Sequence, residues 1–327
     1  MIRHALLLAA TLLATSLSAA PEETRDYRDH PEFAAFAEKM QAEHGYTAAE
    51  LDVLFTNVTR QQKILDAISS PAEGKDWHEY RPIFITDARI EAGRKFWNEH
   101  EALLARAERE FGVDREIIVA IIGVETYYGR ITGSWRVIDA LSTLGFDYPP
   151  RMNFFRSELE EFLLLVREED IDTSTVSGSY AGAMGGGQFI PSSYRMYAVD
   201  FDKDGKRDLW NSWPDVIGSV ANYLSRHRWH DNEPVAVPAA AGDDAQGLPR
   251  EQGMTITTAA ELRNKGLVFS RDISGDTEVR LVALQLEDEL VYWLGLHNFG
   301  VINRYNRSPL YAMAVMELAT AIERARR

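Results

Sequence analysis

The sequence lacks cysteine altogether and has few positive charges, with 35 Lys and Arg against 50 Asp and Glu and a formal net charge of −15. The absence of cysteine excludes disulfides, thiolate metal sites and a cysteine nucleophile, and we expect no lipid anchor on an N-terminal cysteine. The acidic balance is not that of a general nucleic-acid binder or a polybasic membrane-surface protein. Folding therefore rests on packing, with an oxygen-ligated metal as a candidate support.

Long hydrophobic runs are also missing after the first twenty residues. Arg3 and His4 precede an apolar run at 5–17, and small residues at 18–20 come before Pro21. This order is typical of a secretory signal peptide, here residues 1–20. Because a membrane span needs about 20 apolar residues, a retained anchor is the weaker alternative. We therefore expect a soluble protein exported to the periplasm.

The remaining composition is that of an ordinary globular protein, with 45% hydrophobic and 26% charged residues in a chain of 327. This length suffices for one large core or two to three small ones, and disorder is excluded as the main state. Apolar residues at helical spacing predict a mostly helical chain. Helices are predicted at 134–144, 152–168, 213–228 and 310–326, from residue 33 to Gly45, and from Thr86 or Asp87 to Phe111 without a break. Three more helices are predicted by their start signals: the capping box Thr47–Glu50, a cap at Asp114 and Pro191.

The character of the sequence changes after Glu233, where proline and glycine separate short β-branched runs. We predict strands at 235–237, 255–258, 279–286 and 290–294. The chain contains no internal repeat.

Glu125 is the most informative acid, because it follows a long apolar run. Helical spacing places Ile118, Ile121 and Ile122 seven, four and three residues before it, so its carboxylate is expected on the apolar face. Burial raises the pKa of a carboxyl group, as a general acid working near neutral pH requires. A structural ion pair is the alternative. We expect the helix to stop at Gly129.

A second candidate is segment 177–189, which consists mainly of glycine, alanine and serine. Small residues let a bulky ligand approach the backbone, while Ser179 and Gln188 offer polar contacts suited to sugars. A phosphate-binding loop is disfavoured, because no Lys-Ser/Thr pair follows the glycines. A flexible surface loop is the plainer alternative.

Residues 200–211 match the start of an EF-hand calcium loop. The expected ligands are the carboxylates of Asp200, Asp202 and Asp204 and the carbonyl of Lys206. The twelfth position is an asparagine where a bidentate glutamate is usual, so the ligand set is complete only if Asp215 joins it. We expect a structural Ca²⁺, with Na⁺ or Mg²⁺ as alternatives, and an acidic turn without an ion as the other interpretation.

Two further chemistries find little support. His227 and His230 lie three residues apart, but no zinc motif bearing a glutamate accompanies them. No Gly-x-Ser-x-Gly elbow occurs, so a serine hydrolase is not indicated.

Six motifs follow one another along the chain: IGVET at 122–126, FDYP at 146–149, GAMGGGQFIPSSY at 182–194, the Asp200 loop, SVANY at 219–223 and RYN at 304–306. Together they resemble the B-type lytic murein transglycosylases, from about Tyr80 to the C-terminal helix. The resemblance implies a mainly α (α+β) fold, with a lysozyme-like helical catalytic core carrying an EF-hand-like loop, a flanking helical domain and a small antiparallel β domain.

The resemblance also suggests domain limits. We expect a signal peptide at 1–20, an N-terminal helical region at 21–112, the catalytic core at 113–232 with its loop at 200–215, a β-rich domain at 233–295, and a C-terminal segment and helix at 296–327 that packs back on the helical region.

The implied reaction cleaves the β-1,4 bond between N-acetylmuramic acid and N-acetylglucosamine without added water, forming 1,6-anhydromuramoyl ends. Glu125 would act first as acid and then as base, with no organic cofactor. The residues implied to contact substrate are Tyr80, Arg151, Ser179, Gln188, Phe189, Tyr223, Tyr305, Asn306 and Tyr311.

Two departures from the family pattern stand out. Pro150-Arg151 leaves one arginine where members often have two, and the N-terminal cysteine that carries a lipid in many members is absent. The implied partners are peptidoglycan glycan strands, with cell-wall synthases as further candidates, and neither nucleic acid nor membrane. The open alternatives are a hydrolytic muramidase, a non-catalytic peptidoglycan-binding protein and a calcium-binding structural protein.

Overall fold

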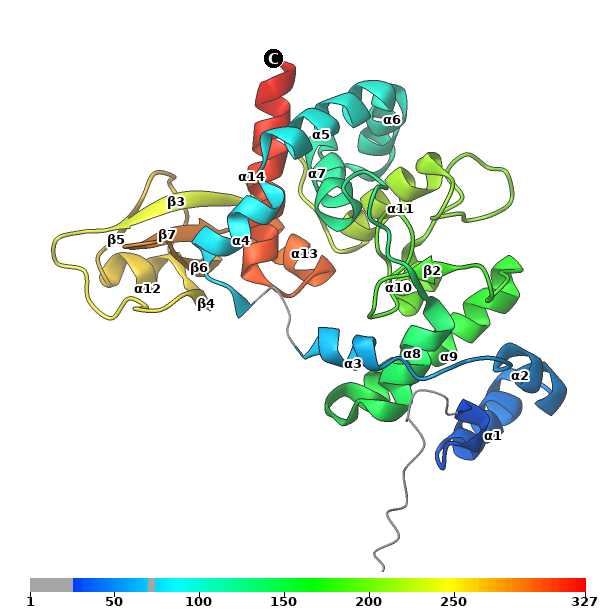
Figure 1. The fold of residues 1–327 in the computed structure, drawn as a ribbon. Helices are drawn as coiled ribbons and strands as arrows, with labels where there is room; N and C mark the ends of the chain where they lie inside the picture. The colour runs from blue at the N-terminus through cyan, green and yellow to red at the C-terminus, as the bar shows by residue number, and fades with distance from the viewer. Residues whose placement is uncertain (1–25, 70–73) are drawn as a thin grey trace, which may run out of the picture.

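The structure is a computed structural model that describes residues 26–69 and 74–327. The predicted signal peptide, residues 1–20, lies outside the described residues. Helices make up most of the molecule, and a small antiparallel sheet stands at one end (Figure 1). In the described part of the chain, no helix is long and apolar enough to cross a membrane.

The predicted elements occur in order, and the structure adds helices at 62–68, 77–84, 259–264 and 297–305 and strands at 135–136, 177–178 and 267–269 that the sequence did not predict. The helices are α1 Phe33–His44, α2 Ala48–Leu54, α3 Gln62–Ile68, α4 Trp77–Phe84, α5 Asp87–Glu99, α6 Glu101–Phe111, α7 Arg115–Thr126, α8 Val137–Asp147, α9 Met152–Glu169, α10 Pro191–Tyr197, α11 Trp213–Arg226, α12 Ala259–Asn264, α13 His297–Tyr305 and α14 Pro309–Arg326. The strands are β1 Trp135–Arg136, β2 Ser177–Gly178, β3 Ala236–Ala241, β4 Gly253–Thr258, β5 Leu267–Phe269, β6 Glu278–Gln285 and β7 Leu290–Gly295.

Local signals at the ends of the first helices are confirmed. Gly45 ends α1 in the left-handed conformation, with φ of 66°. Thr47 and Glu50 form the predicted capping box at α2, where the Thr47 backbone N–H donates to Glu50 Oε2 at 2.7 Å. These signals involve residues a few positions apart, so the sequence alone determines them.

The single long helix predicted up to Phe111 is wrong. The helix breaks at His100, whose φ and ψ are −109° and 21°, and continues as α6. The two halves pack on different neighbours, because α5 lies against α7 and α14 while α6 lies against α7 and α11. Phe96 and His100 pack on the Trp213 ring at the break, with centroid distances of 4.9 and 5.8 Å. Tertiary packing therefore overrides a locally uninterrupted helical pattern.

Asp114 begins α7 as predicted but does not cap it with its side chain. Its carboxylate instead accepts hydrogen bonds from the Trp229 indole at 2.8 Å and from the Asn232 backbone at 3.1 Å. The acid thus ties the segment after α11 to the start of α7, a connection that the local sequence does not reveal.

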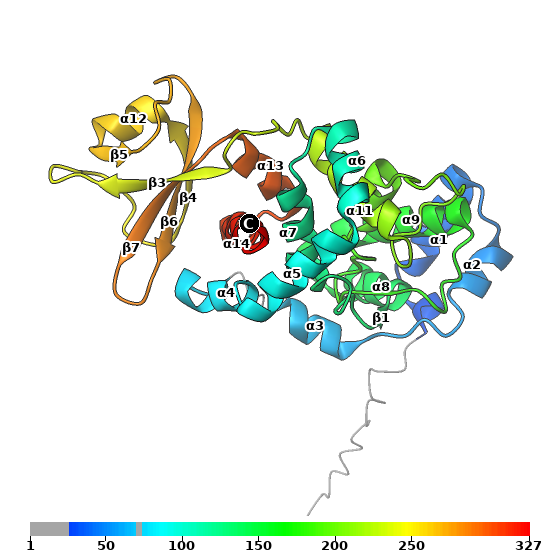
Figure 2. The ribbon, with the colours of Figure 1, turned by 90° about the horizontal axis from the view of Figure 1, so that it is seen from above.

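The four predicted strands are confirmed, and together with β5, which the sequence did not predict, they form a five-stranded antiparallel sheet in the order β4-β6-β7-β3-β5. Alternate residues of β6 face opposite sides. Val279 and Leu281 belong to a small core with α12, whereas Val282 and Leu284 join the main core, which α4 and α13 help to form. The sheet is therefore attached to the helical part through one of its faces (Figure 2).

Helix α7 lies at the centre of the helical part, against α5, α6, α11 and α14. Its residues from Ile117 to Val124 are all buried, because a helix that is apolar on every side must be covered on every side. Helix α14 lies between the sheet and the other helices (Figures 1 and 2). This packing places the end of α7 and the start of α14 next to each other.

Candidate active site

The site is built around Glu125 in the last turn of α7. Ile118, Ile121 and Ile122, at the positions that the helical spacing assigned, are completely buried, whereas Glu125 itself is only partly buried. A carboxyl group at the end of a buried helix faces apolar walls on one side and a reachable surface on the other. Such a position suits proton transfer to a bound ligand.

The end of α7 differs from the prediction, because the helix stops at Thr126 and not at Gly129. Tyr127 and Tyr128 both adopt left-handed backbone conformations, with φ of 51° and 59°. For residues other than glycine, each such conformation costs on the order of 1 kcal/mol. The surrounding packing must therefore hold this turn next to Glu125.

Tyr128 supplies much of that packing, since its phenol inserts between α5 and α7. A Cβ atom at Gly93 or Gly123 would lie only 2.3 or 2.4 Å from the Tyr128 hydroxyl oxygen. The two glycines therefore make room for the ring. They are the sequence signal of this turn, but only the fold brings them together.

Thr126 and Arg89 also hold the turn, a role that the sequence did not predict for either residue. The Thr126 hydroxyl lies 3.0 Å from the Gly186 carbonyl and accepts a hydrogen bond from the Gly129 backbone at 3.0 Å. Arg89 is buried, and its guanidinium carbon lies 4.7 Å from the centre of the Tyr127 ring. An arginine in an ordinary amphipathic helix gives no local sign of this role.

The Tyr311 hydroxyl donates a hydrogen bond of 2.5 Å to Glu125 Oε1. Tyr311 belongs to the first turn of α14, and its ring is parallel to that of Tyr305, at a centroid distance of 6.4 Å. Burial, followed by the negative charge of Glu125, raises the pKa of both phenols well above the ordinary value. Both hydroxyls therefore remain proton donors at neutral pH.

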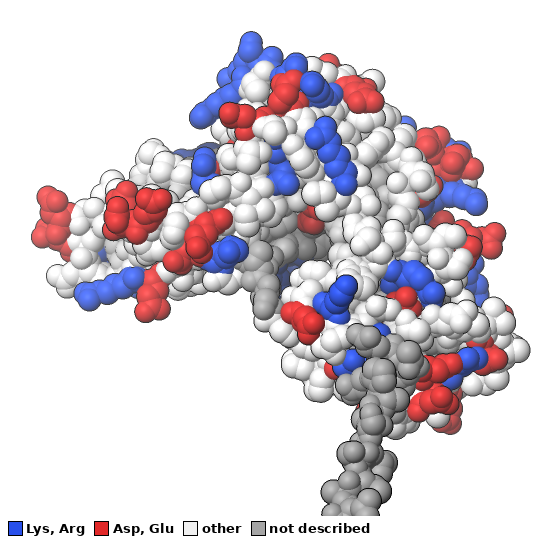
Figure 3. All heavy atoms as spheres, in the orientation of Figure 1, with Lys and Arg blue, Asp and Glu red and all other residues white. Residues whose placement is uncertain are grey.

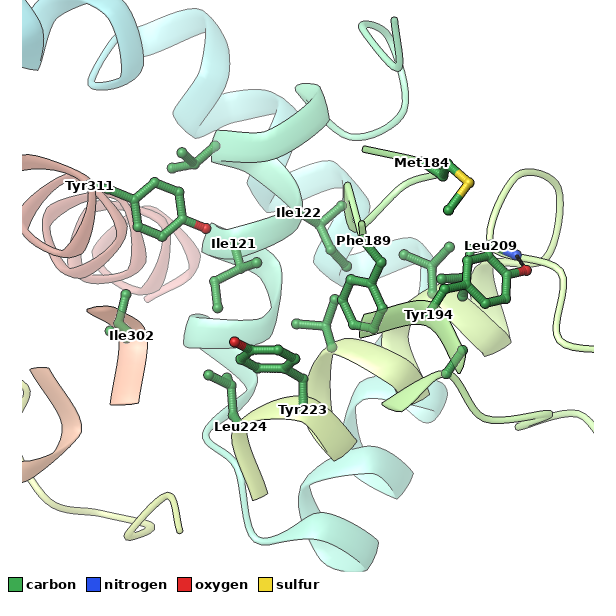
Figure 4. Close-up of a cluster of buried hydrophobic side chains, with 14 of the residues drawn as sticks. Ile121, Ile122, Met184, Phe189, Tyr194, Leu209, Tyr223, Leu224, Ile302 and Tyr311 are labelled. Atoms are coloured by element: carbon green, nitrogen blue, oxygen red, sulfur yellow. Dashed lines mark hydrogen bonds between the residues drawn. The ribbon is translucent and has the colours of Figure 1, made fainter. Parts of the chain in front are cut away.

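The other aromatic residues predicted to contact substrate lie around Tyr305 and Tyr311. The Tyr223 and Tyr305 rings lie 4.7 Å apart, and Phe189 lies 5.8 and 5.7 Å from them. Tyr80 on α4 is 2% exposed, and it is among the groups that raise the pKa of Tyr311. Figure 4 shows Tyr311 extending from α14 toward α7, with Tyr223 and Phe189 beside α7.

Hydrogen bonds within the glycine-rich segment and to Thr132 hold it in place. Ser179 Oγ accepts from the backbone N–H groups of Ala181 and Ala183 at 3.2 and 3.0 Å. Gln188 Nε2 donates to the carbonyls of Thr132 and Gly185 at 3.1 and 3.0 Å. These bonds argue against a flexible surface loop.

The same segment is attached to the site through its glycines. A Cβ at Gly185 would lie 2.3 Å from the Leu209 carbonyl oxygen, so this glycine permits close packing of backbone. The Tyr305 hydroxyl donates to the Gly187 carbonyl at 2.6 Å. This hydrogen bond connects the segment to the Tyr305–Tyr311 pair.

Two predicted substrate residues have other contacts. The Arg151 guanidinium carbon lies 4.4 Å from the centre of the Phe154 ring at the start of α9. Asn306 Oδ1 accepts from the Ser308 backbone N–H at 3.0 Å, which fixes the turn between α13 and α14. Asn306 thus supports the start of the helix that carries Tyr311.

The Asp200 loop brings three carboxylates together, since one oxygen each from Asp200, Asp202 and Asp204 lies within 4.8 Å of the others. Gly205 turns the loop with φ of 96°, and its N–H donates to Asp200 at 2.9 Å. Three converging negative charges repel one another, and a hard cation with oxygen ligands would remove that repulsion. The residues present therefore fit a calcium-type ion.

Asp215, at the start of α11, holds the loop through hydrogen bonds to its backbone. It is completely buried, and its two oxygens accept from the backbone N–H groups of Phe201 and Asp208 at 2.7 and 2.8 Å. Burial raises the pKa of its carboxyl group. Lys206, the other predicted ligand, donates its backbone N–H to Asp204 at 2.9 Å, and its position in the loop is the predicted one.

Comparison with known proteins now adds to this geometry. Residues 28–320 match the transglycosylase SLT domain family. Membrane-bound lytic murein transglycosylase B of Escherichia coli K12 is 41% identical over 311 residues, which cover 92% of this chain and 85% of that protein.

The chain is also similar to solved structures of lytic transglycosylases. The soluble lytic transglycosylase SltB1 of Pseudomonas aeruginosa is 53% identical, with a TM-score of 0.83 over 90% of this chain and 99% of that one. The Escherichia coli lytic transglycosylase Slt35 in complex with calcium is 42% identical, with a TM-score of 0.84 over 93% and 96% of the two chains.

Proposed function

The chain belongs to the transglycosylase SLT domain family and is a lytic transglycosylase that acts on peptidoglycan; we propose that Glu125 is its catalytic acid and base. The bond cleaved is the β-1,4 linkage between N-acetylmuramic acid and N-acetylglucosamine, and the products end in 1,6-anhydromuramoyl groups. The observation that carries the role of Glu125 is its hydrogen bond from Tyr311 inside a wall of buried tyrosines.

A mechanism with one carboxyl group follows from the family, and Glu125, which accepts a hydrogen bond from Tyr311, is the residue proposed for it. An ordinary glycosidase needs a second carboxylate across the scissile bond as nucleophile or base. A lytic transglycosylase does not, because its nucleophile is the C6 hydroxyl of the substrate's own muramoyl residue.

The proton path then follows from one carboxyl group. Protonated Glu125 gives its proton to the glycosidic oxygen as the bond to the muramoyl C1 breaks, and N-acetylglucosamine leaves with that oxygen. The Glu125 carboxylate next takes the proton of the C6 hydroxyl, whose oxygen bonds to C1 and closes the anhydro ring. Intramolecular attack profits from effective molarities on the order of 10⁵ M or more. No water is consumed.

Tyr311 serves the second half of this cycle. A hydrogen bond donated to a carboxylate stabilises its charged form, and a bond to an ionised group contributes about 1.5–3 kcal/mol. The proton of Tyr311 therefore compensates the negative charge that Glu125 acquires in a partly buried position.

Mass spectrometry of digested sacculi tests the proposal, since anhydro and reducing ends differ by one water. We expect anhydro ends from the wild-type protein and a strongly reduced yield of them from Glu125→Gln. Reducing ends alone would identify a muramidase. Equal binding without turnover by both proteins would identify a non-catalytic peptidoglycan-binding protein.

We further propose that Ser179 and Gln188 contact the sugar near the cleaved bond. The Ser179 oxygen accepts two backbone N–H groups, which leaves its proton to donate. The Gln188 amide nitrogen donates to two carbonyls, which leaves its Oε1 to accept. Further glycan contacts proposed from the family resemblance are Tyr80, Arg151, Phe189, Tyr223, Tyr305, Asn306 and Tyr311.

A structural calcium ion is proposed for the Asp200 loop. Asp200, Asp202, Asp204 and the Lys206 carbonyl would hold it, with Asp215 closing the loop. The ion would neutralise the converging carboxylates and take no part in bond cleavage. The converging oxygens and the calcium complex of Slt35 support this site. Export by the predicted signal peptide would bring the enzyme to its substrate in the periplasm.

A further inference from the structure

A second cleft, of about 750 Å³, lies where the end of α11 meets α13 and strands β4 and β6. Its walls carry one acid and five arginines: Glu278, Arg226, Arg228, Arg280, Arg304 and Arg307. In a chain of net charge −15, this accumulation of positive charge is unusual. The cleft is separate from the acidic Asp200 loop.

Most of this positive charge is uncompensated. Glu278 pairs with Arg280 at 3.2 Å, whereas within residues 26–69 and 74–327 the other four arginine side chains form no ion pair or hydrogen bond. These four arginines are exposed, so water and salt screen part of their charge, but together they give the cleft a positive potential that favours an anion. The cleft therefore has the charge of a binding site for an anionic ligand.

One of the arginines has a fixed position. The Arg280 side chain is 18% exposed, and a Cβ atom at Gly300 of α13 would lie 2.7 Å from its guanidinium carbon. The guanidinium thus lies close to the α13 backbone at Gly300, where a larger residue would make the Arg280 side chain shift. A fixed guanidinium loses less entropy when it binds a ligand than a mobile side chain does.

The cleft shares α13 with the active site. The Arg304 carbonyl accepts the Tyr223 hydroxyl at 2.7 Å, and the next residue, Tyr305, is stacked on Tyr311. The cleft and the proposed glycan site are therefore adjacent along α13.

The residues that line the cleft indicate which chemical groups of a ligand would bind there. Arginine pairs with carboxylates through two parallel hydrogen bonds, and several arginines around one cavity favour a ligand with several carboxylates. Met254, Val301 and Ile256, which is 58% exposed, add apolar surface. A cleft of this volume accommodates a short peptide. Carboxylates spaced by short apolar side chains are a property of acidic peptides.

We propose that this cleft binds the carboxylate-bearing stem peptides of peptidoglycan. The inference rests on the proposed function, since the stem peptide is attached to the muramoyl residue of that substrate. It explains how a strongly acidic enzyme associates with a polyanionic wall: the cleft offers a local positive field to the peptide.

Calorimetric titration with a free stem tetrapeptide tests the cleft without turnover. We expect binding by the wild-type protein, a loss of about tenfold or more in affinity in Arg226→Glu/Arg307→Glu, and weaker binding at high salt. The control is Arg271→Glu/Arg324→Glu, which changes the net charge equally at exposed positions elsewhere. Figure 3 shows the basic end of α14, where Arg324 lies. The control should bind as the wild type does.

Two results would overturn the proposal: no tetrapeptide binding by the wild type, or equal losses in both double variants. Inorganic phosphate at matched ionic strength should not displace the peptide. Full displacement would identify a general anion site instead. If the tetrapeptide binds while sacculi yield no anhydro ends, the proposed function fails and the cleft assignment stands.

Discussion

The Glu125 centre and the Asp200 loop are assembled in opposite ways. The loop takes its three clustered carboxylates from five consecutive residues. The centre joins Glu125 to Tyr311, which lies 186 positions away, and to a turn held by residues of α5. The ligands of the Asp200 loop are therefore neighbours in the sequence, whereas the residues of the Glu125 centre come together only when the chain folds.

This difference determines what each site depends on. The loop carries repulsion between like charges that an ion would remove, so its stability should follow the cation. The centre depends on the packing of α5, α7 and α14, so adding or removing a single atom where these helices touch should change its catalytic activity. Substitutions at the two sites should therefore produce different kinds of defect.

The largest effect is expected from Glu125→Gln. Removing the only proposed acid and base should lower turnover of sacculi by about 10²–10⁴-fold, with an unchanged melting temperature. Glu116→Gln is the matched control on the same helix, because burial raises the pKa of Glu116 although it lies at the far end of α7. A Glu125→Gln protein with full turnover would refute the role of Glu125.

Tyr311→Phe should have the next largest effect. Losing a hydrogen bond to a carboxylate, which contributes about 1.5–3 kcal/mol, should lower turnover by about 10- to 100-fold. Tyr292→Phe removes a comparable hydroxyl, which donates to the Pro249 carbonyl at 2.7 Å in the sheet region. This control should retain full turnover. Equal activity of the two variants would mean that the bond to Glu125 has no catalytic role.

The sequence predicted the parts of the fold that depend on neighbours in the chain. The capping box at Thr47, four of the five strands of the sheet and the apolar surroundings of Glu125 follow from local sequence patterns. The break at His100 does not, because it arises from two different packing partners. The left-handed turn at Tyr127 was missed for the same reason.

The site was predicted unevenly. Glu125 follows from its place after an apolar run, whereas the substrate residues came from the family resemblance. Tyr311 meets Glu125 only because α14 packs against α7, and Tyr305 joins them because α13 packs against α14. The hydrogen bonds that occupy Ser179 and Gln188 connect loop atoms whose positions no sequence pattern fixes.

Calcium should affect stability more than chemistry. If the ion binds the Asp200 loop, saturation at one hundred times its dissociation constant adds about 2.7 kcal/mol to the free energy of unfolding. The melting temperature should rise by several degrees with calcium and fall with chelator. Asp204→Asn should reduce this response, while Asp243→Asn, at an exposed position near the sheet, should not. A melting temperature indifferent to calcium and chelator would refute the ion site.

The smallest effect tests the packing behind the Glu125 turn. Gly123→Ala places a methyl group 2.4 Å from the Tyr128 hydroxyl oxygen, which should cost about 1–2 kcal/mol of stability. The hydroxyl is buried and has no hydrogen-bond partner among the described residues, so Tyr128→Phe alone should be nearly neutral.

Combining the two substitutions isolates the contact. Because Tyr128→Phe removes the atom that the methyl group meets first, the double variant should recover about half of the lost stability, a coupling of roughly 1 kcal/mol in denaturant unfolding. Additive effects would mean that the glycine is not required by this ring. Coupling in stability together with coupled losses of turnover would show that the packing of α5 on α7 reaches the catalytic carboxyl group, a dependence that the Asp200 loop should not share.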